Sequence, residues 1–279
     1  MTYLPASRVF LMAFRWTLMG ALRGKLLWLI LFISIGLQLV APAFDALAPG
    51  CKTVFIMEFS IGAASLASLL LGLLFSLPLM TEATGGLLGV VQAAGKGYGA
   101  WIAGRICAIG LLLAFFLVVF GVLALVGGYI TYVSESALLH SQMDTIKTDV
   151  GHRWLMAALA EARTALNPMM LARTLMVLWL RSLVVAALGL VAAALCTDFG
   201  AAFLLSVLVF LVAGAASYDA TSLWREVLAW VLPNFALYGL LVETLSPTVW
   251  QVTCLFGATV LYLCFYGAIT SLILRRRVK

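Results

Sequence analysis

The sequence predicts an all-helical membrane domain with six transmembrane helices, and three observations lead to this fold class. Hydrophobic residues make up 65% of the 279-residue chain and charged residues only 10%. Soluble domains contain roughly 45–50% apolar and about 25% charged residues, so the remaining residues cannot form a water-facing surface. Six apolar runs approach the length of a membrane-crossing helix, and most of the bases lie at the ends of these runs.

Each of the six runs is predicted to be a helix, because a segment in lipid has to satisfy its own backbone hydrogen bonds. The predicted spans are 26–41, 55–80, 100–130, 175–196, 199–216 and 249–274. The third span is longer than a bilayer requires, so it either projects from the membrane or tilts strongly, whereas the fifth is short. Residues 1–279 are therefore expected to form a single transmembrane domain.

A basic segment precedes the first span. Between residues 7 and 25, four bases are interspersed with aliphatic and aromatic residues: Arg8, Arg15, Arg23 and Lys25. This pattern favours a helix over residues 1–25 that lies in the membrane interface, with Arg15, Arg23 and Lys25 as its anchors to lipid headgroups. The alternative is a straight extension of the first span, which would bring these bases close to the apolar layer.

The distribution of Lys and Arg predicts the orientation. With the N-terminus inside, the inner segments carry ten bases, and the outer segments carry seven over a longer stretch of chain. This count assigns Arg105 to the inner side and Arg181 to the outer side. The acids show the opposite bias, with only Glu82 and Asp198 inside. Both termini are therefore predicted to be cytoplasmic, as an even number of spans requires.

The first long outer segment, 131–174, contains an amphipathic helix. Its apolar face includes Trp154 and Ala162, and it is expected to end at Asn167-Pro168, since proline cannot continue a helix.

The second long outer segment, 217–248, contains two apolar pieces on either side of Pro233-Asn234, each too short to cross a bilayer. A re-entrant helical hairpin that turns at Pro233-Asn234 is expected. Its aromatic residues are expected at the outer interface, namely Trp230, Phe235 and Tyr238. The alternative is one kinked span, which would give seven spans and place the basic C-terminal tail outside.

Segment 81–99 on the inner side separates two long apolar runs and is rich in glycine. Four apolar residues can form one face of a short helix parallel to the membrane: Leu87, Leu88, Val90 and Val91. Such a helix can bind in a groove of a soluble partner. A flexible linker is the alternative.

No residue pattern predicts catalysis, a cofactor or a metal site in this chain. The five cysteines show no ligand spacing, and His140 and His152 both lie in the first outer segment. The sequence "GKGYG" lacks the pattern of a phosphate-binding loop. Nucleic-acid binding is not expected either, because the bases flank apolar runs.

In layout, the chain resembles the permease subunit of bacterial ABC transporters of the export type, a family that includes polysaccharide, drug and copper-maturation exporters. The stretch "LRGKLLWL" is similar to the element that precedes the family's first span, and "VLPNFALYGLL" with "LYLCFYGAITSLILRRR" resembles its outer hairpin, last span and basic tail. The family's motifs between spans two and three are similar to Glu82, Gly86-Leu87, Lys96 and Gly104-Arg105. The Pro-x-Ser-Arg element of the family is replaced here by Ala94-Gly95-Lys96.

The resemblance implies a permease of the bacterial inner membrane that exports or extracts a lipid, polysaccharide, drug or peptide. Its partners would be ATPase subunits that bind ATP and Mg²⁺, a second permease copy or homologue, and membrane lipid. Segment 81–99 would be the coupling helix, with Glu82 capping it or pairing with the ATPase, and with Lys96 and Arg105 at the anionic leaflet. The residues expected to couple to the ATPase are Glu82, Gly86, Leu87, Leu88, Val91 and Lys96.

The hairpin would close the outer mouth of the transport path, with Pro233, Asn234 and Phe235 as the gate, or would serve only as an anchoring cap. Two other functions stay open at this point. A membrane scaffold or assembly protein would hold a periplasmic partner through 131–174. A lipid-modifying enzyme is less favoured, because the sequence shows no cluster of His, Asp, Glu or Cys.

The predicted topology can be tested by labelling single cysteines in intact cells. Cysteines that replace Lys96 or Lys279 are expected to be shielded from an impermeant thiol reagent, and a cysteine that replaces Asp149 is expected to react. Labelling at position 279 from outside would contradict the six-span topology and favour seven spans.

Overall fold

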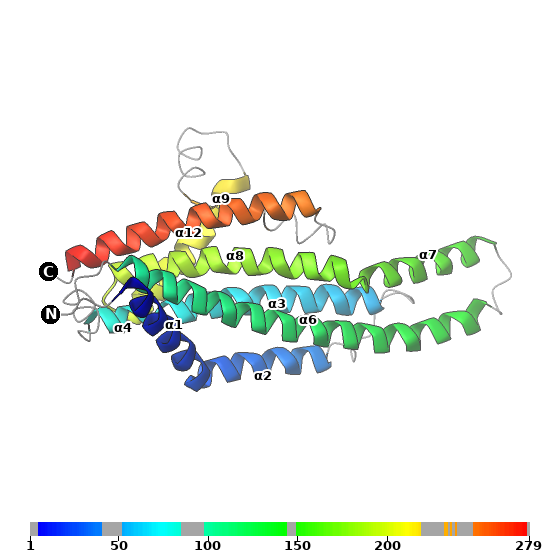
Figure 1. The fold of residues 1–279 in the computed structure, drawn as a ribbon. Coiled ribbons are helices and arrows are strands. Elements are labelled where there is room, and N and C mark those ends of the chain that lie inside the picture. The colour runs from blue at the N-terminus through cyan, green and yellow to red at the C-terminus, as the bar shows by residue number, and fades with distance from the viewer. Residues whose placement is uncertain are drawn as a thin grey trace.

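The computed structural model describes residues 5–40, 52–84, 98–143, 149–218 and 248–277, together with 232, 233, 235 and 238. Within these residues the chain is helical and contains no strand. The helices form an elongated bundle, from which part of α6 and α7 extend as an arm (Figure 1). The helices are α1 (Ala6–Arg23), α2 (Lys25–Val40), α3 (Lys52–Ser76), α4 (Leu79–Thr84), α6 (Gly99–Met143), α7 (Asp149–Ala165), α8 (Pro168–Leu195), α9 (Phe199–Tyr218) and α12 (Val249–Arg277).

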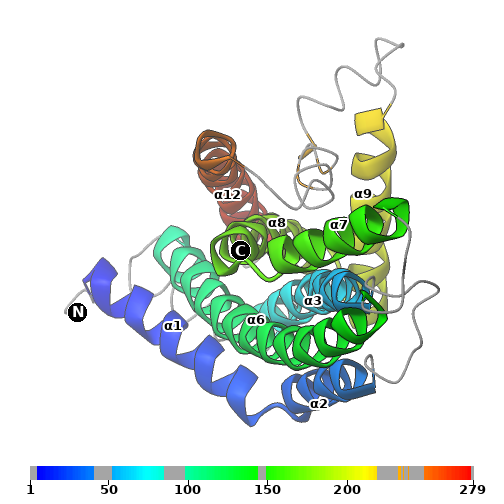
Figure 2. The same cartoon turned by 90° about the vertical axis from the view of Figure 1, so that its right-hand side faces the viewer.

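Several of these helices suit a membrane. Four are long and apolar enough to cross one: Lys52–Glu82, Gly99–Ser141, Pro168–Leu195 and Val249–Arg277. The pair α1–α2 adds a fifth if it counts as one bent span, and the apolar helix Phe199–Ala213 is shorter. Viewed along the bundle, α9 leans away from the direction that α3, α6 and α8 share (Figure 2). The all-helical prediction is confirmed with four or five candidate spans, while the count of six stays a prediction.

The arm arises from the length of α6. At a rise of 1.5 Å per residue, its 45 residues extend over roughly 67 Å, about twice the thickness of a bilayer's apolar core. The prediction that the third span is unusually long is therefore confirmed. Near the base of the arm, Glu135 of α6 accepts hydrogen bonds from Lys52 N (3.0 Å), Thr53 N (3.1 Å) and Thr53 Oγ1 (2.7 Å). These bonds satisfy backbone donors at the start of α3.

Local sequence determines how α7 ends and α8 begins. Helix α7 ends at Ala165, and Pro168 opens α8, where its missing N–H and fixed φ do no harm. The side chain of Asn167 caps α8 by accepting a hydrogen bond from Met169 N at 3.0 Å. The helix end predicted at Asn167-Pro168 is confirmed.

Small residues bring α3 and α8 close together, as is usual where membrane helices pack. A Cβ on Gly72 would lie only 2.8 Å from the carbonyl oxygen of Ser182. The Ser182 hydroxyl donates to Ser68 Oγ at 2.9 Å.

At the end of α8, Arg277 of α12 donates to the carbonyl oxygens of Ala194 (2.8 Å) and Cys196 (2.6 Å). A cation here satisfies acceptors that the last turn of a helix leaves open.

Helices α1 and α2 meet at Gly24 with a bend of 58°. One face of α1 is buried through residues four positions apart, and its bases are exposed. The buried residues are Val9, Ala13, Thr17 and Ala21. A straight extension of the first span does not fit this bend, whereas the position of α1 in a membrane interface stays a prediction.

Two groups of side chains that the sequence places on the outer side pack inside the bundle, and their side of the membrane stays a prediction. Arg181, counted as an outer base, lies within α8, and its guanidinium donates to Ser65 Oγ of α3. Phe235 and Tyr238, expected at the outer interface, are buried instead. The Tyr238 hydroxyl is hydrogen-bonded to Thr259 Oγ1 of α12 at 2.8 Å. Residue type and span order do not show which neighbouring helix a side chain meets.

The close contact of α1 with α6 predicts a strong effect at Gly104. A Cβ there would lie 2.4 Å from the carbonyl oxygen of Phe10 and 3.0 Å from the Cβ of Ala13. Gly104→Ala is expected to lower the free energy of unfolding by about 1–3 kcal/mol through overpacking. The matched control is Gly127→Ala on the same helix, where a Cβ meets no atom within 4 Å. Equal thermal midpoints for the two purified variants would contradict this packing.

Candidate functional site

The candidate site lies at the end of the bundle that holds α4 and the start of α6, called the α4 end below (Figure 1). Helix α3 stops at Ser76, and Pro78 follows in a turn closed by a bond from Met80 N to the Leu77 carbonyl oxygen at 3.0 Å. Proline favours such a break, because it lacks a backbone donor and restricts the residue before it. The turn separates α4 from α3, and Glu82 of α4 faces α6.

A buried ion pair joins α4 to α6. Arg105 Nη1 contacts Glu82 Oε2, and the two side chains are only 2% and 6% exposed. The indole Nε1 of Trp101 donates to the same carboxylate oxygen at 3.2 Å. Trp101 and Arg105 are four residues apart on α6 and therefore share one face. A buried charge is tolerated where it is paired and hydrogen-bonded, and the Glu82 carboxylate has both an ion-pair partner in Arg105 and a hydrogen bond from Trp101.

The ion pair corrects the expected position of Arg105. The prediction that Arg105 faces anionic lipid is wrong, because its side chain is buried against Glu82. Glu82 was expected to cap the following helix or to contact an ATPase. In the structure it contacts Arg105 and Trp101 of its own chain. Its part in coupling to an ATPase stays a prediction.

The same end of the bundle holds Tyr98, which is buried next to the start of α6. Burial raises the pKa of the Tyr98 phenol above its ordinary value, and the positive charge of Arg275 acts in the opposite direction. One apolar cluster includes Ala13 of α1, Leu79 of α4, Tyr98 and Leu274 of α12. Both flanks of residues 85–97 are therefore anchored in a core to which α1, α4, α6, α8, α9 and α12 contribute.

The other predicted site residues are only partly described. Of the coupling residues, Gly86, Leu87, Leu88, Val91 and Lys96 lie outside the described residues, as does Asn234 of the outer gate. Pro233 and Phe235 are buried, and the Phe235 ring packs against Phe210 of α9 with 4.8 Å between ring centroids. The three predicted anchors are exposed on α1 and α2, as lipid contact requires: Arg15, Arg23 and Lys25.

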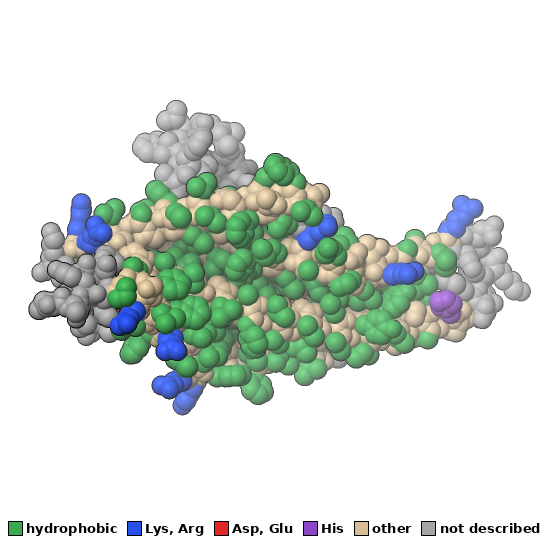
Figure 3. Space-filling model, viewed as in Figure 1, with side chains coloured by type: hydrophobic (Ala, Val, Ile, Leu, Met, Phe, Trp, Pro, Cys, Tyr) green, Lys and Arg blue, Asp and Glu red, His purple; other side chains and the backbone are tan. Residues whose placement is uncertain are grey.

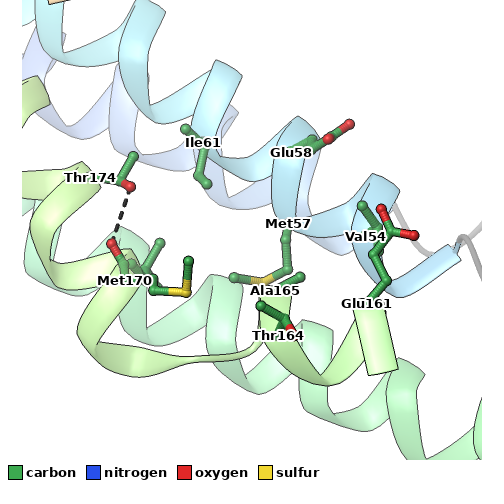
Figure 4. Close-up of a pocket in the computed structure, with 10 residues that line it drawn as sticks. Val54, Met57, Glu58, Ile61, Glu161, Thr164, Ala165, Met170 and Thr174 are labelled. Atoms are coloured by element: carbon green, nitrogen blue, oxygen red, sulfur yellow. Dashed lines mark hydrogen bonds between the residues drawn. The ribbon is translucent and has the colours of Figure 1, made fainter. Parts of the chain in front are cut away.

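A second feature is a cavity of about 210 Å³ at the base of the arm, between α3, α7 and α8. Met57 and Met170 face each other across it (Figure 4). Thr174, on its wall, donates to the Met170 carbonyl oxygen at 3.1 Å and is thus satisfied within α8. Two carboxylates, Glu58 and Glu161, also line the cavity. In the described part of the chain, no group of three or more His, Cys, Asp or Glu residues is placed to hold a metal ion.

Comparison with known proteins adds no relative: no family model and no curated protein matches this chain. The fold defines an all-helical chain with helices suited to a membrane.

The ion pair predicts a large and non-additive loss of stability when one partner is removed. Glu82→Gln or Arg105→Met alone is expected to cost about 3–5 kcal/mol, because each leaves a buried charge without its partner. The double variant is expected to lose clearly less than the sum of the single losses.

Thermal or denaturant midpoints of the purified chain in detergent measure this cycle. Arg153→Gln serves as the control, since Arg153 is exposed and its loss is expected to stay within about 0.5 kcal/mol. Additive single losses would show that Glu82 and Arg105 do not depend on each other.

Proposed function

We propose that this chain is the membrane-spanning permease subunit of an ATP-driven ABC transporter of the export type, in the bacterial inner membrane. Six helices span the bilayer in this proposal: α2, α3, α6, α8, α9 and α12. A separate ATPase binds ATP and Mg²⁺ and contacts residues 85–97. The permease pairs with a second copy or a homologue, both termini are cytoplasmic, and no residue of this chain is catalytic. The substrate class is a lipid, polysaccharide, drug or peptide.

The observation that carries this proposal is the buried ion pair at the α4 end. Glu82 and Arg105 lie on either side of residues 85–97 in the sequence and are joined within the bundle. A force applied to that segment by an ATPase reaches α4 and α6 together, because pulling them apart exposes two opposite charges in an apolar core. Gly104 then passes the movement to α1, whose backbone lies against it. Such a rigid link is what coupling of ATP hydrolysis to helix movement requires.

The surface of the bundle also supports the proposal. Hydrophobic side chains cover its middle, and the basic side chains on this face gather toward its two ends and over the arm (Figure 3). On α6 the exposed apolar side chains recur every three or four residues, which places them on one face. They are Leu111, Phe115, Val118 and Val122. An exposed apolar face of this kind is suited to contact with lipid.

One observation favours a second candidate, a membrane scaffold that holds a periplasmic partner. The arm formed by α6 and α7 extends beyond the rest of the bundle (Figure 1). Large apolar side chains are exposed along it: Leu138, Trp154 and Met156. Away from lipid, exposed apolar side chains of this size indicate a protein contact. An arm of this kind also fits a transporter that transfers its substrate to a partner. Binding of an ATPase to this chain therefore distinguishes the two functions.

The coupling segment provides the decisive experiment. Leu88→Glu is expected to weaken ATPase binding about a hundredfold or more, because a charge desolvated without a partner costs several kcal/mol. Leu88→Met, which keeps an apolar side chain, is the matched control. The measurements are pull-down of the ATPase and stimulated ATP hydrolysis, at equal amounts of inserted protein.

Trp101→Phe separates binding from coupling. This change removes one hydrogen bond to Glu82 and should cost only about 0.5–1.5 kcal/mol of stability. It is expected to keep ATPase binding and to reduce stimulated hydrolysis.

The scaffold function is favoured if Leu88→Glu leaves both ATPase binding and stimulated hydrolysis intact, while Trp154→Ala releases an outer partner.

A further inference from the structure

A cavity of about 180 Å³ occupies the angle between α1 and α2, close to the buried ion pair. Its walls come from α1, Gly24, α2, the end of α3 and the side chains of Glu82 and Arg105. Apolar groups, including Leu27 and Phe75, form much of the lining. The cavity is therefore an apolar space with a few polar atoms at one side.

Two of these polar atoms lack a hydrogen-bond partner. Thr17 Oγ1 and Arg105 Nε are buried, and neither has a partner among the described residues. As whole residues, Thr17 and Arg105 are only 6% and 1% exposed. A buried donor without an acceptor is costly, so native proteins rarely leave one unpaired. The Arg105 Nε–H can only donate and the Thr17 hydroxyl can donate or accept, so acceptor oxygens on one ligand would satisfy both groups.

The charge around the cavity is entirely positive on α1 and α2. Residues 5–40 contain no Asp or Glu, and Arg23 and Lys25, on either side of Gly24, are both exposed. Trp16 and Leu26 line the cavity and are largely exposed as well, which gives its edge an apolar character. A ligand with a negative group, acceptor oxygens and an apolar chain fits these three features together.

We propose that this cavity binds one anionic phospholipid at the joint between α1 and α2. The phosphate lies at Arg23 and Lys25, and ester oxygens accept hydrogen bonds from Thr17 and Arg105. An acyl chain begins against Leu27 and Phe75. The proposal concerns lipid held by this chain and does not depend on a transport function, because its test requires no ATPase.

Native mass spectrometry of the full chain in a neutral detergent tests the proposal. The probes are dioleoylphosphatidylglycerol and dioleoylphosphatidylcholine. One phosphatidylglycerol is expected to stay bound at concentrations about tenfold or more below those that phosphatidylcholine needs, since two surface bases contribute roughly 1 kcal/mol each toward an anionic lipid. Equal retention of the two lipids would overturn the proposal.

Gly20 allows the cavity to be filled. It lines the space, and a Cβ there meets no atom within 4 Å. Gly20→Phe is expected to abolish the tightly held phosphatidylglycerol, whereas Gly20→Ala, the matched control, keeps it. Unchanged retention by a folded Gly20→Phe variant would show that the lipid lies elsewhere.

Thr17→Val gives an independent test if Gly20→Phe does not fold. Replacing the unpaired hydroxyl with a methyl group is expected to raise the thermal midpoint of the lipid-free chain and to lower the shift that phosphatidylglycerol produces. If neither the thermal midpoint of the lipid-free chain nor the shift produced by phosphatidylglycerol changes, the contact assigned to Thr17 is overturned.

Sodium phosphate distinguishes the source of the phosphate group. Displacement of the lipid by millimolar phosphate would show a phosphate site without lipid recognition and would overturn the proposal.

Discussion

The pairing of Glu82 with Arg105 is the interaction on which the α4 end of this molecule depends. In a chain this apolar, a charge inside the bundle needs a polar partner within it, because neither lipid nor apolar core side chains can solvate it. The pair joins α4 to α6, and Trp101 holds the carboxylate from the same face of α6. Residues of α1 and α12 pack around this joint. The position of both flanks of residues 85–97 therefore follows from one electrostatic constraint.

Close packing of small residues places the other helices around that joint. Gly104 brings α1 onto α6, and Gly72 brings α3 onto α8, each at a distance that leaves no space for a Cβ. Burial of apolar surface does not distinguish one helix pairing from another in lipid, so backbone approach and interhelical hydrogen bonds decide it. The bond between Ser182 and Ser68 has this role between α3 and α8. Arg181 extends the polar contact between these helices by donating to Ser65.

Both functional inferences concern the α4 end. In the proposed transporter, residues 85–97 receive the movement of an ATPase, and the ion pair distributes it to α4 and α6. The proposed lipid site is lined by the same Arg105, in the angle of the α1–α2 joint. A lipid in that cavity would stabilise whichever arrangement of α1, α2 and α6 keeps its donors paired. At the opposite end, the arm exposes large apolar side chains, among them Leu138, Trp154 and Met156.

The sequence by itself determined the helical class, most helix positions, the unusual length of the third apolar run and the break at Asn167-Pro168, because these follow from apolar run length and local capping chemistry. It did not determine where α6 ends, since this helix continues past the predicted limit at residue 130 to Met143. It also determined that α1 and the start of α2 are basic and free of acids. Only the tertiary structure decided that Arg105 meets Glu82, that Arg181 lies within the bundle, and that Phe235 and Tyr238 are buried. Residue type places a base or an aromatic ring at a membrane surface by default. A partner on another helix overrides that default, and such a partner is fixed by packing between segments that are distant in the sequence.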